Sequence, residues 1–425
     1  MTPAGPTGTT FGGPEDRTVS ITGERSTMTA QAGGCEMPRP EAAAPEGDDP
    51  PLSALRVAIV HYWLVGMRGG EKVLEELCEI FPQADLYTHV AIPQNISEKL
   101  RRHRIRETFI AKLPGGRRHY QKYLPLMPRA LEALDLDAYD LVISSESGPA
   151  KGVITGPDTL HLCYCHSPMR YVWDQYPVYR AQAGRLTRWL MPLAVPRLRM
   201  WDQSSAARVD RIVANSDFVR RRIAKSWGRA ASVVHPPVDL DAFVPQAGTP
   251  PGDFYLYVGE LVSYKRVDLL IDAFNASGRK LVVIGDGGER DRLEARAKGN
   301  IRFHGRASLD ELKAHYAGCR ALMFPGVEDF GIVPLEAMAS GRPVIAYARG
   351  GALETVKDGV TGLFFDRPDV DSINAAIARF ESELEPAIDP AALRAHVDGF
   401  SRARFRAGML REIEAVLATR KPAAP

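Results

Sequence analysis

The chain has 425 residues, a formal net charge of +2, and contains 45% hydrophobic and 25% charged residues. This length allows two domains with their own cores, and the composition is that of a folded globular protein, which excludes a fibrous or wholly disordered chain. No apolar run approaches the ~20 residues that a membrane-spanning helix needs.

The N-terminal segment and the cysteines give two further expectations. Residues 1–52 are rich in Pro, Gly, Thr and Ala and lack the apolar core of a signal peptide, which predicts a disordered leader.

Cys163 and Cys165 lie two apart in an apolar run, and no second Cys or His pair follows at metal-binding spacing. We therefore expect reduced, buried thiols and no metal or other cofactor.

The first half of the chain alternates apolar runs with helical stretches. Parallel strands are predicted at residues 55–61, 84–90, 139–145, 159–166 and 211–214. The first strand leads into a glycine-rich loop at 63–72 and a helix at 73–81, which is the opening of a Rossmann-like half. The glycine spacing is not that of a dinucleotide fingerprint, so an NAD site is not expected. Gly69 and Gly70 either face a phosphate or the reacting sugar, or serve only a tight turn.

Two basic stretches in the first half indicate an anionic partner. Residues 101–129 contain nine Lys or Arg and one acid, and residues 180–229 contain twelve Lys or Arg and three acids. Aromatic side chains among the cations of 101–129 indicate an anionic membrane surface, with a solvated helix face as an equal alternative. No nucleic-acid-binding module is recognisable, so no nucleic acid partner is expected.

His166 is a candidate catalytic residue because it ends a predicted strand. Ligands of open α/β sheets bind at the carboxyl ends of the strands, and histidine suits proton chemistry. The segment that follows, 169–179, is predicted to be a loop that is rich in aromatic residues and suits a sugar or lipid acceptor. Its candidate acceptor-side residues are Arg170, Trp173 and Tyr176.

The second half repeats the alternation after a hinge that contains Pro236 and Pro237. Strands are predicted at residues 254–259, 280–284, 301–306, 320–324 and 344–347. Helices are predicted at 267–274, at 309–317 and, as the last element, at about 401–419. The two halves therefore predict two α/β domains.

Several strand ends of the second half are candidate phosphate or nucleotide contacts. Lys265 and Arg266 lie at a strand-to-helix turn, where cations are unusual, and they are suited to clamp a pyrophosphate. Gly285 and Asp286 form a turn at which backbone can meet a ligand, and Arg306 ends the next strand.

Two glutamates stand where a strand ends and a helix begins. Glu328 lies in the loop after the strand at 320–324, and Glu336 is expected in the first turn of the helix. Free N–H groups around 330–333 favour an anion, and Gly331 lets a ligand approach the backbone. Carboxylates beside an anion site indicate a ligand that is both phosphorylated and rich in hydroxyls, such as a sugar nucleotide.

In order along the chain, these groups resemble the landmarks of the retaining glycosyltransferase family 4. The segments Glu328-Asp329-Phe330-Gly331-Ile332 and Glu336-Ala337-Met338-Ala339-Ser340-Gly341 are similar to the glutamate-pair motif of that family. The other matching groups are Gly66…Gly69-Gly70, Asn215-Ser216, Pro236-Pro237-Val238-Asp239, Gly259…Tyr264-Lys265-Arg266-Val267-Asp268 and Gly285-Asp286-Gly287. The resemblance covers about residues 55–420.

The resemblance implies a GT-B fold, in which two Rossmann-like, doubly wound α/β domains face each other across a cleft. It implies an acceptor domain at 53–236, a nucleotide-sugar domain at 237–398, and a helix at 399–420 that crosses back to the first domain.

The resemblance also implies roles for single residues. Glu336 would bind the ribose hydroxyls, and Glu328 and the amides of Phe330–Ile332 would hold the donor sugar. Lys265 would contact the pyrophosphate, and His166 would lie near the reacting sugar. The expected catalytic residues are therefore His166, Glu328 and Lys265.

Glu260 departs from the family pattern. Many relatives carry an arginine at this position as a second cation for the phosphates, and a carboxylate cannot do the same. Either Arg266 compensates, or Lys265 and backbone amides are sufficient.

The expected reaction transfers a hexose to a hydroxyl with retention of the anomeric configuration and without a metal ion. The stretches 66–72, 163–171 and 260–268 look like those of bacterial mannosyltransferases of surface-polysaccharide assembly, so GDP-mannose is the expected donor. A UDP-sugar such as UDP-glucose is the alternative donor. A sugar phosphorylase and a non-catalytic GT-B partner subunit are the alternatives of other classes.

The expected acceptor is a saccharide linked to a polyprenyl diphosphate. The basic and aromatic first domain fits such an acceptor at the cytoplasmic face of the membrane. We therefore expect a cytoplasmic protein with peripheral contact to an anionic bilayer.

Overall fold

The N-terminal half forms a parallel sheet in doubly wound order. The computed structural model describes residues 51–146, 148–245 and 251–420. The strands lie in the spatial order β3 (Ile105–Glu107), β2 (Asp85–Thr88), β1 (Val57–His61), β4 (Leu141–Glu146), β5 (Leu160–Cys165), β6 (Arg211–Ala214) and β7 (Ser232–Val233). All pairs are parallel. All five residues of β1 are buried, as expected for a strand that helices cover on both faces.

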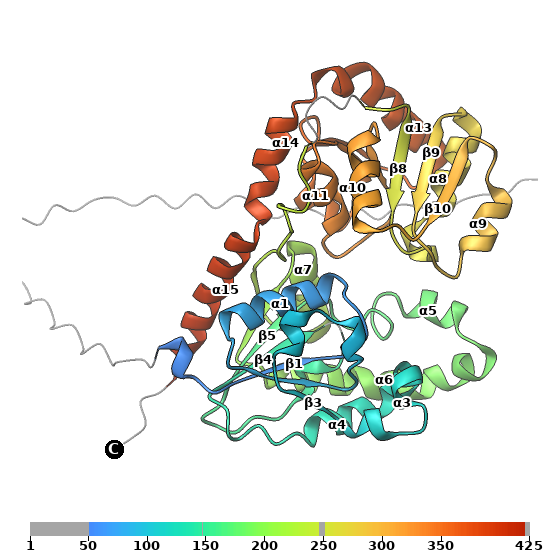
Figure 1. Cartoon of the computed structure of the whole chain (residues 1–425). Coiled ribbons are helices and arrows are strands. Elements are labelled where there is room, and N and C mark those ends of the chain that lie inside the picture. The colour runs from blue at the N-terminus through green and yellow to red at the C-terminus, as the bar shows by residue number, and fades with distance from the viewer. Residues whose placement is uncertain (1–50, 147, 246–250, 421–425) are drawn as a thin grey trace, which may run out of the picture. The chain divides into compact units, whose positions relative to one another are not determined.

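The C-terminal half repeats this strand order in a second parallel sheet. Its strands are β10 (Ile301–Gly305), β9 (Lys280–Ile284), β8 (Phe254–Val258), β11 (Leu322–Phe324), β12 (Val344–Tyr347) and β13 (Gly362–Phe365). Each sheet has its own apolar core, and Figure 1 shows the helices that pack around them. Two Rossmann-like sheets confirm the predicted fold class, and both have the order that places ligands at the carboxyl ends of the strands.

The helices predicted from the sequence are all found, and further α-helices accompany them. In the first half they are α1 (Gly69–Ile80), α2 (Glu98–Arg101), α3 (Gly116–His119), α4 (Met127–Glu132), α5 (Tyr176–Gln182), α6 (Arg185–Ala207) and α7 (Asp217–Trp227). In the second half they are α8 (Val267–Ser277), α9 (Arg290–Arg296), α10 (Leu309–Gly318), α11 (Ile332–Ala339), α12 (Ala352–Thr355), α13 (Val370–Arg379), α14 (Pro390–Val397) and α15 (Arg402–Leu417). No helix in these described ranges is both long and apolar enough to cross a bilayer.

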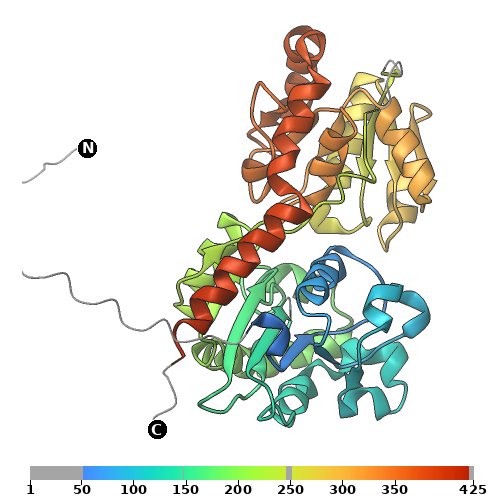
Figure 2. The same ribbon diagram turned by 60° about the vertical axis from the view of Figure 1, so that its left-hand side comes forward.

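The last helix packs against the core of the first sheet. Phe405, Met409, Ile413 and Val416 of α15 are buried in the same cluster as residues of β1 and α1. Figure 2 shows α15, in red, running from the helices of the second sheet to the first. Its apolar residues recur at helical spacing, which is why the sequence predicts it.

Three predicted details need correction. The 169–179 segment is not entirely a loop, because α5 begins at Tyr176 with Pro177 in its first turn. Glu336 lies in the second turn of α11, since the helix begins at Ile332 after Gly331, whose φ is 92°. The predicted leader falls outside the described residues except for its last two, and a 3-10 turn begins at Leu52.

The cysteines within the described residues are all buried, as predicted. They are Cys78, Cys163, Cys165 and Cys319. Cys163 and Cys165 pack in one cluster with α7, which agrees with the predicted shared face of a strand.

Three buried histidines of the first domain should make its stability depend on pH. Burial lowers the pKa of His89 to about 4 and those of His161 and His166 to about 3. Between these values and about 6.5 the unfolded chain binds protons that the folded chain does not, so stability falls as the pH falls. The limiting slope is about 1.4 kcal/mol per pH unit for each histidine.

We expect the urea midpoint of the first domain to fall steadily from pH 7 to pH 5. Carboxylates whose pKa is lowered in the fold change the stability mainly below about pH 4.5. The change between pH 7 and pH 5 therefore comes mainly from the histidines. A midpoint that stays constant over the window would contradict the expected protonation of these residues.

Candidate functional site

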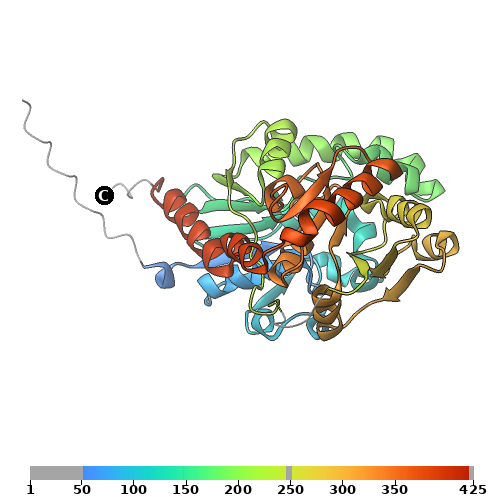
Figure 3. The ribbon, with the colours of Figure 1, turned by 90° about the horizontal axis from the view of Figure 1, so that it is seen from above.

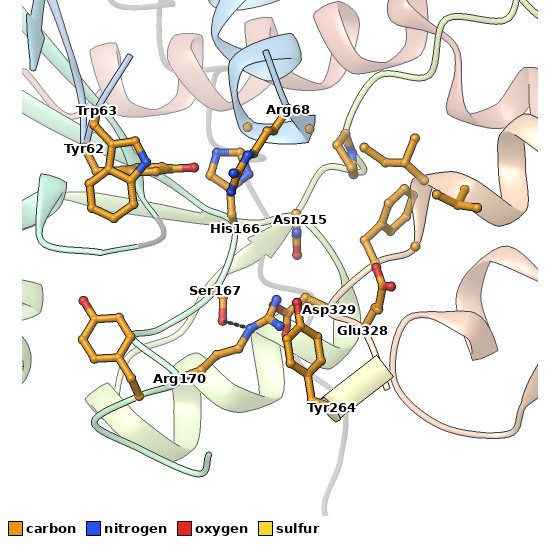
Figure 4. Close-up of a pocket in the computed structure, with 18 of the residues that line it drawn as sticks. Tyr62, Trp63, Arg68, His166, Ser167, Arg170, Asn215, Tyr264, Glu328 and Asp329 are labelled. Carbon is orange, nitrogen blue, oxygen red and sulfur yellow. Dashed lines mark hydrogen bonds and ion pairs between the residues drawn. The ribbon is translucent and has the colours of Figure 1, made fainter. Parts of the chain in front are cut away.

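A cavity of about 680 Å³ is lined by loops that follow strands of both sheets. The first sheet contributes the β1–α1 loop and the segment after β5, and the second contributes the loop between β11 and α11. Figure 4 shows His166 and Arg68 on one side and Glu328 and Tyr264 on the other. Of the predicted residues, the cavity brings together His166, Arg170, Gly69, Gly70, Glu328, Phe330, Gly331 and Ile332.

The two glycines that begin α1 bring its backbone close to side chains that line the cavity or adjoin it. A Cβ atom on Gly70 would lie 3.0 Å from the Tyr62 hydroxyl and 3.7 Å from Nε2 of His166. A Cβ atom on Gly69 would lie 3.1 Å from a side-chain carbon of Ile332, which belongs to the second domain. A larger residue at position 70 would therefore occupy space beside His166.

His166 is the end of a buried chain of hydrogen bonds. The Ser145 hydroxyl lies 2.9 Å from Nε2 of His166 and 3.0 Å from Nδ1 of His61. Nε2 of His61 lies 3.9 Å from a carboxylate oxygen of Glu71, whose other oxygen accepts from the Arg68 amide. Burial would raise the pKa of Glu71, but its contacts with His61 outweigh burial and lower that pKa.

This chain determines the protonation of His166. An anionic Glu71 favours a proton on Nε2 of His61, which leaves Nδ1 as an acceptor for the single Ser145 hydroxyl proton. Ser145 then accepts from Nε2–H of His166, so Nδ1 of His166 is unprotonated. Burial lowers the pKa of His166 to about 3, which keeps the imidazole neutral at ordinary pH.

Glu328 and Lys265 form an ion pair beside the cavity. The Lys265 ammonium lies 2.9 Å from Oε1 of Glu328. Burial alone would lower the pKa of Lys265, but the Glu328 carboxylate outweighs it, and the pKa is raised. Lys265 therefore stays charged and is paired with Glu328, but it lines neither this cavity nor the smaller one that shares Arg68 with it.

Glu336 is buried, lines neither of these two cavities, and has contacts from both domains. The Tyr316 hydroxyl donates to its Oε2 over 3.1 Å, and Lys72 of α1 lies 3.6 Å from its Oε1. Burial raises the pKa of Glu336, and Lys72 opposes the rise. A buried carboxylate held from one side by a hydroxyl retains lone pairs for further donors.

Asp329 joins the two domains at the floor of the cavity. Its carboxylate binds Arg170, and it also accepts from Nη1 of Arg222 over 2.6 Å. The Ser216 hydroxyl donates to the Asp329 carbonyl over 2.5 Å. Arg170, predicted on the acceptor side, therefore lines the cavity and also binds the opposite domain.

A second contact between the domains lies at the start of α7. The Glu354 carboxylate of α12 accepts from the amides of Asp217 and Phe218 over 2.7 and 3.0 Å. A carboxylate at a helix N-terminus is stabilised by the unpaired amides and the helix dipole. His235 lies 3.2 Å from the same carboxylate and stacks on Phe330 of the cavity wall.

Other residues predicted at strand ends of the second domain line the second, smaller cavity. It is lined by Arg68, Glu260, Asp286, Gly287 and Arg306. The two cavities share Arg68, which reaches from the start of α1 toward His166 in Figure 4.

Three predicted donor residues have structural partners of their own. A Cβ atom on Gly285, whose φ is 141°, would lie 1.8 Å from the Gly259 carbonyl oxygen, so two loops pack backbone against backbone there. Arg266 lines neither cavity, and its Nε lies 3.3 Å from Asp268. Arg306 lies 3.6 Å from Asp286.

Trp173 and Tyr176 lie outside the two cavities. The Trp173 indole donates to the buried Asp202 carboxylate over 2.7 Å. Tyr176 packs in the cluster beneath α6, where the Arg199 guanidinium lies 5.3 Å from its ring. These contacts are with residues of α6, so the structure does not bring Trp173 and Tyr176 to the cavity with the other predicted residues.

Several residues at or near the two cavities were not predicted from the sequence. Arg68 and Lys72 flank the predicted glycines and are cations at a helix start, which is the same signal that singles out Lys265. Tyr62, Trp63 and Tyr264 give the cavity aromatic walls. Ser145 has no signal of its own, because its role depends on two histidines from other strands.

No group of three or more potential metal ligands occurs in residues 51–146, 148–245 and 251–420. The prediction of a reaction without a metal ion rests on Lys265 and on helix N-termini, and it stays a prediction.

Two family models match most of the described chain. Residues 67–242 match the model described as glycosyltransferase family 4, and residues 245–390 match the model described as glycosyl transferases group 1. The boundary between the two matches falls between the two sheets.

The curated relatives include several glycosyltransferases. A GDP-mannose-dependent α-(1-6)-phosphatidylinositol monomannoside mannosyltransferase of Mycolicibacterium smegmatis is 31% identical over 218 residues, which are 44% of this chain and 56% of the relative. A D-inositol 3-phosphate glycosyltransferase of Geodermatophilus obscurus is 30% identical over 244 residues, 48% of this chain and 53% of the relative. The chain spans about half the length of the curated relatives that it matches.

Solved structures share the fold. Sucrose-phosphate synthase of Thermosynechococcus elongatus aligns with a TM-score of 0.66 at 19% identity, over 85% of this chain and 99% of that one. HepE of Anabaena, in complex with UDP and glucose, aligns with a TM-score of 0.63 at 15% identity, over 85% of this chain and all of that one.

Proposed function

Because the chain belongs to glycosyltransferase family 4, whose members have the GT-B fold, we propose that it transfers mannose from GDP-mannose to a lipid-linked saccharide with retention of configuration. A hydroxyl of the acceptor attacks the anomeric carbon, the bond from that carbon to the diphosphate oxygen breaks, and GDP leaves with the electron pair. The hydroxyl proton goes to the leaving phosphate on the same face of the sugar.

The observation that carries this proposal is the cavity that joins the two sheets. His166 enters it from the first domain, while Glu328 and the start of α11 enter it from the second. The N–H groups at the start of a helix have no intrahelical partner and favour an anion. A sugar between these two sides would meet Nδ1 of His166 and the Glu328 carboxylate, both of which accept hydrogen bonds from hydroxyls.

Mannose is favoured over glucose by the relatives rather than by the cavity. The relative from Mycolicibacterium smegmatis is named for its dependence on GDP-mannose, and this supports the same donor here. The structure of HepE with UDP and glucose supports the alternative, a UDP-sugar.

A lipid-linked acceptor is the second part of the proposal. Tyr62, Trp63 and Leu124 of the first domain give the cavity apolar and aromatic walls beside His166. The relative from Mycolicibacterium smegmatis is named for a phosphatidylinositol-linked acceptor, which supports an acceptor of that type. Transfer to such an acceptor would take place at a membrane surface.

Arg68 is the cation that we assign in place of the one missing at position 260. Arg266 pairs with Asp268 and does not line the cavities, whereas Arg68 lines both cavities and shares the smaller one with Glu260. A guanidinium in this position would bind the diphosphate from the first domain, opposite Lys265. The charge that leaves with GDP would then be stabilised from both domains.

Replacing Arg68 with alanine is expected to lower the affinity for GDP-mannose about 10-fold, since a hydrogen bond to a charged group contributes about 1.5–3 kcal/mol and Arg68 is exposed. Glu260→Arg should restore affinity in the Arg68→Ala background, because it returns a cation to the same cavity. Arg102→Ala, an exposed arginine that pairs with Glu98, is the control. An Arg68→Ala variant with unchanged affinity would refute the assignment.

Isothermal titration tests the donor class. We expect GDP to bind about 10-fold more tightly than UDP, a difference of about 1.4 kcal/mol, and inorganic phosphate to bind far more weakly. Tighter binding of UDP than of GDP would indicate a UDP-sugar as the donor. Binding of phosphate without either nucleotide would indicate a phosphorylase, and no binding of the three ligands would indicate a non-catalytic partner subunit.

A further inference from the structure

Helix α6 exposes an apolar face opposite to the face that it buries. Leu186, Trp189, Leu193 and Met200 are 71%, 69%, 59% and 65% exposed, and Leu190 is 43% exposed. At 100° per residue these five side chains fall within one arc of about 100° on the helix. Val195 and Asp202, on the opposite side, are buried.

The charge around this face is of one sign. Residues 175–201 contain five arginines and no Asp or Glu. Arg188 and Arg199 bind backbone carbonyls of the same region, while Arg185 and Arg197 are exposed. At 100° per residue Arg197 falls within the apolar arc and Arg185 about 40° outside its edge. A helix with aromatic and aliphatic residues on one face and arginines at or near that face is the pattern of a helix that lies in a bilayer interface.

The face is close to the cavity along the chain. Tyr179 of α5 lines the cavity, and Leu186 follows it by seven residues. Figures 1 and 3 both place α5 and α6 at the side of the first domain away from α15. A lipid-linked acceptor held in a bilayer against α6 would therefore have its saccharide near the first-domain wall of the cavity.

We propose that the exposed face of α6, formed by Leu186, Trp189, Leu190, Leu193 and Met200, binds the interface of an anionic phospholipid bilayer. This proposal names the membrane contact of the proposed function and rests on it for the acceptor, but bilayer binding itself does not depend on the donor. The arginines attract acidic headgroups, and the apolar side chains enter the acyl boundary.

A second copy of this chain fits the face less well. A twofold contact would bring the same surface of both copies together. The exposed Arg185 and Arg197 of one copy would then lie close to those of the other, and residues 175–201 have no acid to neutralise them. Like charges across an interface oppose association.

The test is cosedimentation of the full chain with vesicles, without nucleotide. We expect binding to vesicles of phosphatidylcholine mixed with phosphatidylglycerol, whose acidic headgroups attract arginines, and weak binding to phosphatidylcholine alone. Trp189→Glu with Leu193→Glu should lower the binding at least about 10-fold. The control is Leu309→Glu, an apolar residue 52% exposed on the second domain, which should bind as the wild type does.

A depth measurement identifies the inserted residue. Brominated lipids should quench the fluorescence of the wild type, and this quenching should disappear in Trp189→Phe although the other four tryptophans remain. Absence of vesicle binding by the wild type, or equal loss in the Leu309→Glu control, would overturn the proposal. Dissociation of a dimer by the double substitution, without vesicle binding, would assign the face to a second copy instead.

The same variants separate this proposal from the proposed function. Trp189 and Leu193 do not line the cavity, so the double variant should release GDP from GDP-mannose with a water-soluble acceptor at the wild-type rate. Loss of vesicle binding with retained turnover supports the membrane face. Vesicle binding without turnover of any donor would contradict the proposed function and leave the membrane face intact.

Discussion

Replacing Glu336 with alanine is expected to lower the affinity for GDP-mannose about 100-fold, with a smaller effect on turnover. The carboxylate would accept two ribose hydroxyls, and each hydrogen bond to a charged group contributes about 1.5–3 kcal/mol. The substitution also leaves Lys72 and the Tyr316 hydroxyl without their shared partner. Calorimetric titration of GDP into wild type and variant measures the loss.

Two controls separate the ribose contact from general damage to the site. Glu336→Gln keeps the size and one acceptor oxygen, so it should lose less affinity than Glu336→Ala. Tyr316→Phe removes only the hydroxyl that holds the carboxylate and should have the smallest effect. Unchanged affinity for GDP in Glu336→Ala would exclude the ribose role.

The pH dependence of donor binding should also come from Glu336. Burial raises its pKa, so the carboxylate begins to take up a proton at higher pH than an ordinary glutamate. The protonated form accepts hydrogen bonds less well, so the affinity for GDP should fall as the pH decreases toward that raised pKa. Glu336→Gln should show a flatter dependence.

Replacing His166 with alanine is expected to lower kcat about 100- to 1,000-fold while the affinity for GDP changes little. The imidazole enters the cavity from the first domain, where the sugar and the acceptor would meet. Loss of one positioned hydrogen-bonding group at a reacting centre lowers the rate by about this factor. The rate of GDP release at saturating donor measures the change.

The hydrogen-bond chain behind His166 supplies the matched control. Ser145→Ala leaves the imidazole in the cavity but removes the hydroxyl that determines its tautomer, so kcat should fall by about 5-fold with KM unchanged, as expected for the loss of one hydrogen bond of about 1 kcal/mol. The Ser145→Ala variant should show no new titration near pH 6.5, because burial keeps His166 neutral in the fold. A His166→Ala variant that loses GDP affinity and keeps kcat would reverse the assignment.

Ten of the described strands, helices such as α1, α8 and α15, and the turn before α11 could be predicted because their signals are local, whereas β3, β7 and β13 were not predicted. Buried parallel strands have continuous apolar runs, and a glycine before a helix indicates a turn that a ligand can approach. Thus the sequence alone indicates β1, β5 and the Glu328–Glu336 segment within a few residues of their observed bounds. The helix that contains Glu336 begins at Ile332, directly after Gly331, so Glu336 lies in its second turn and not in the first as predicted.

The partners of these residues could not be predicted in the same way. Arg170 and Asp329 are separated by 159 residues, and Ser145 and His166 by 21, so no local pattern links them. The contacts between the two domains likewise decide which cations would face the diphosphate of the proposed donor. Arg266 has the sequence signal but pairs with Asp268, whereas Arg68 lines the cavity and was not singled out.

The most direct test of the account is a donor screen with the full chain and a polyprenyl-diphosphate-linked saccharide. Release of nucleotide is measured with GDP-mannose, UDP-glucose, UDP-galactose and UDP-N-acetylglucosamine. We predict that GDP-mannose supports the fastest release, at least about 10-fold above the others, corresponding to about 1.4 kcal/mol. Faster release from a UDP-sugar, or release from none of the four donors, would contradict it.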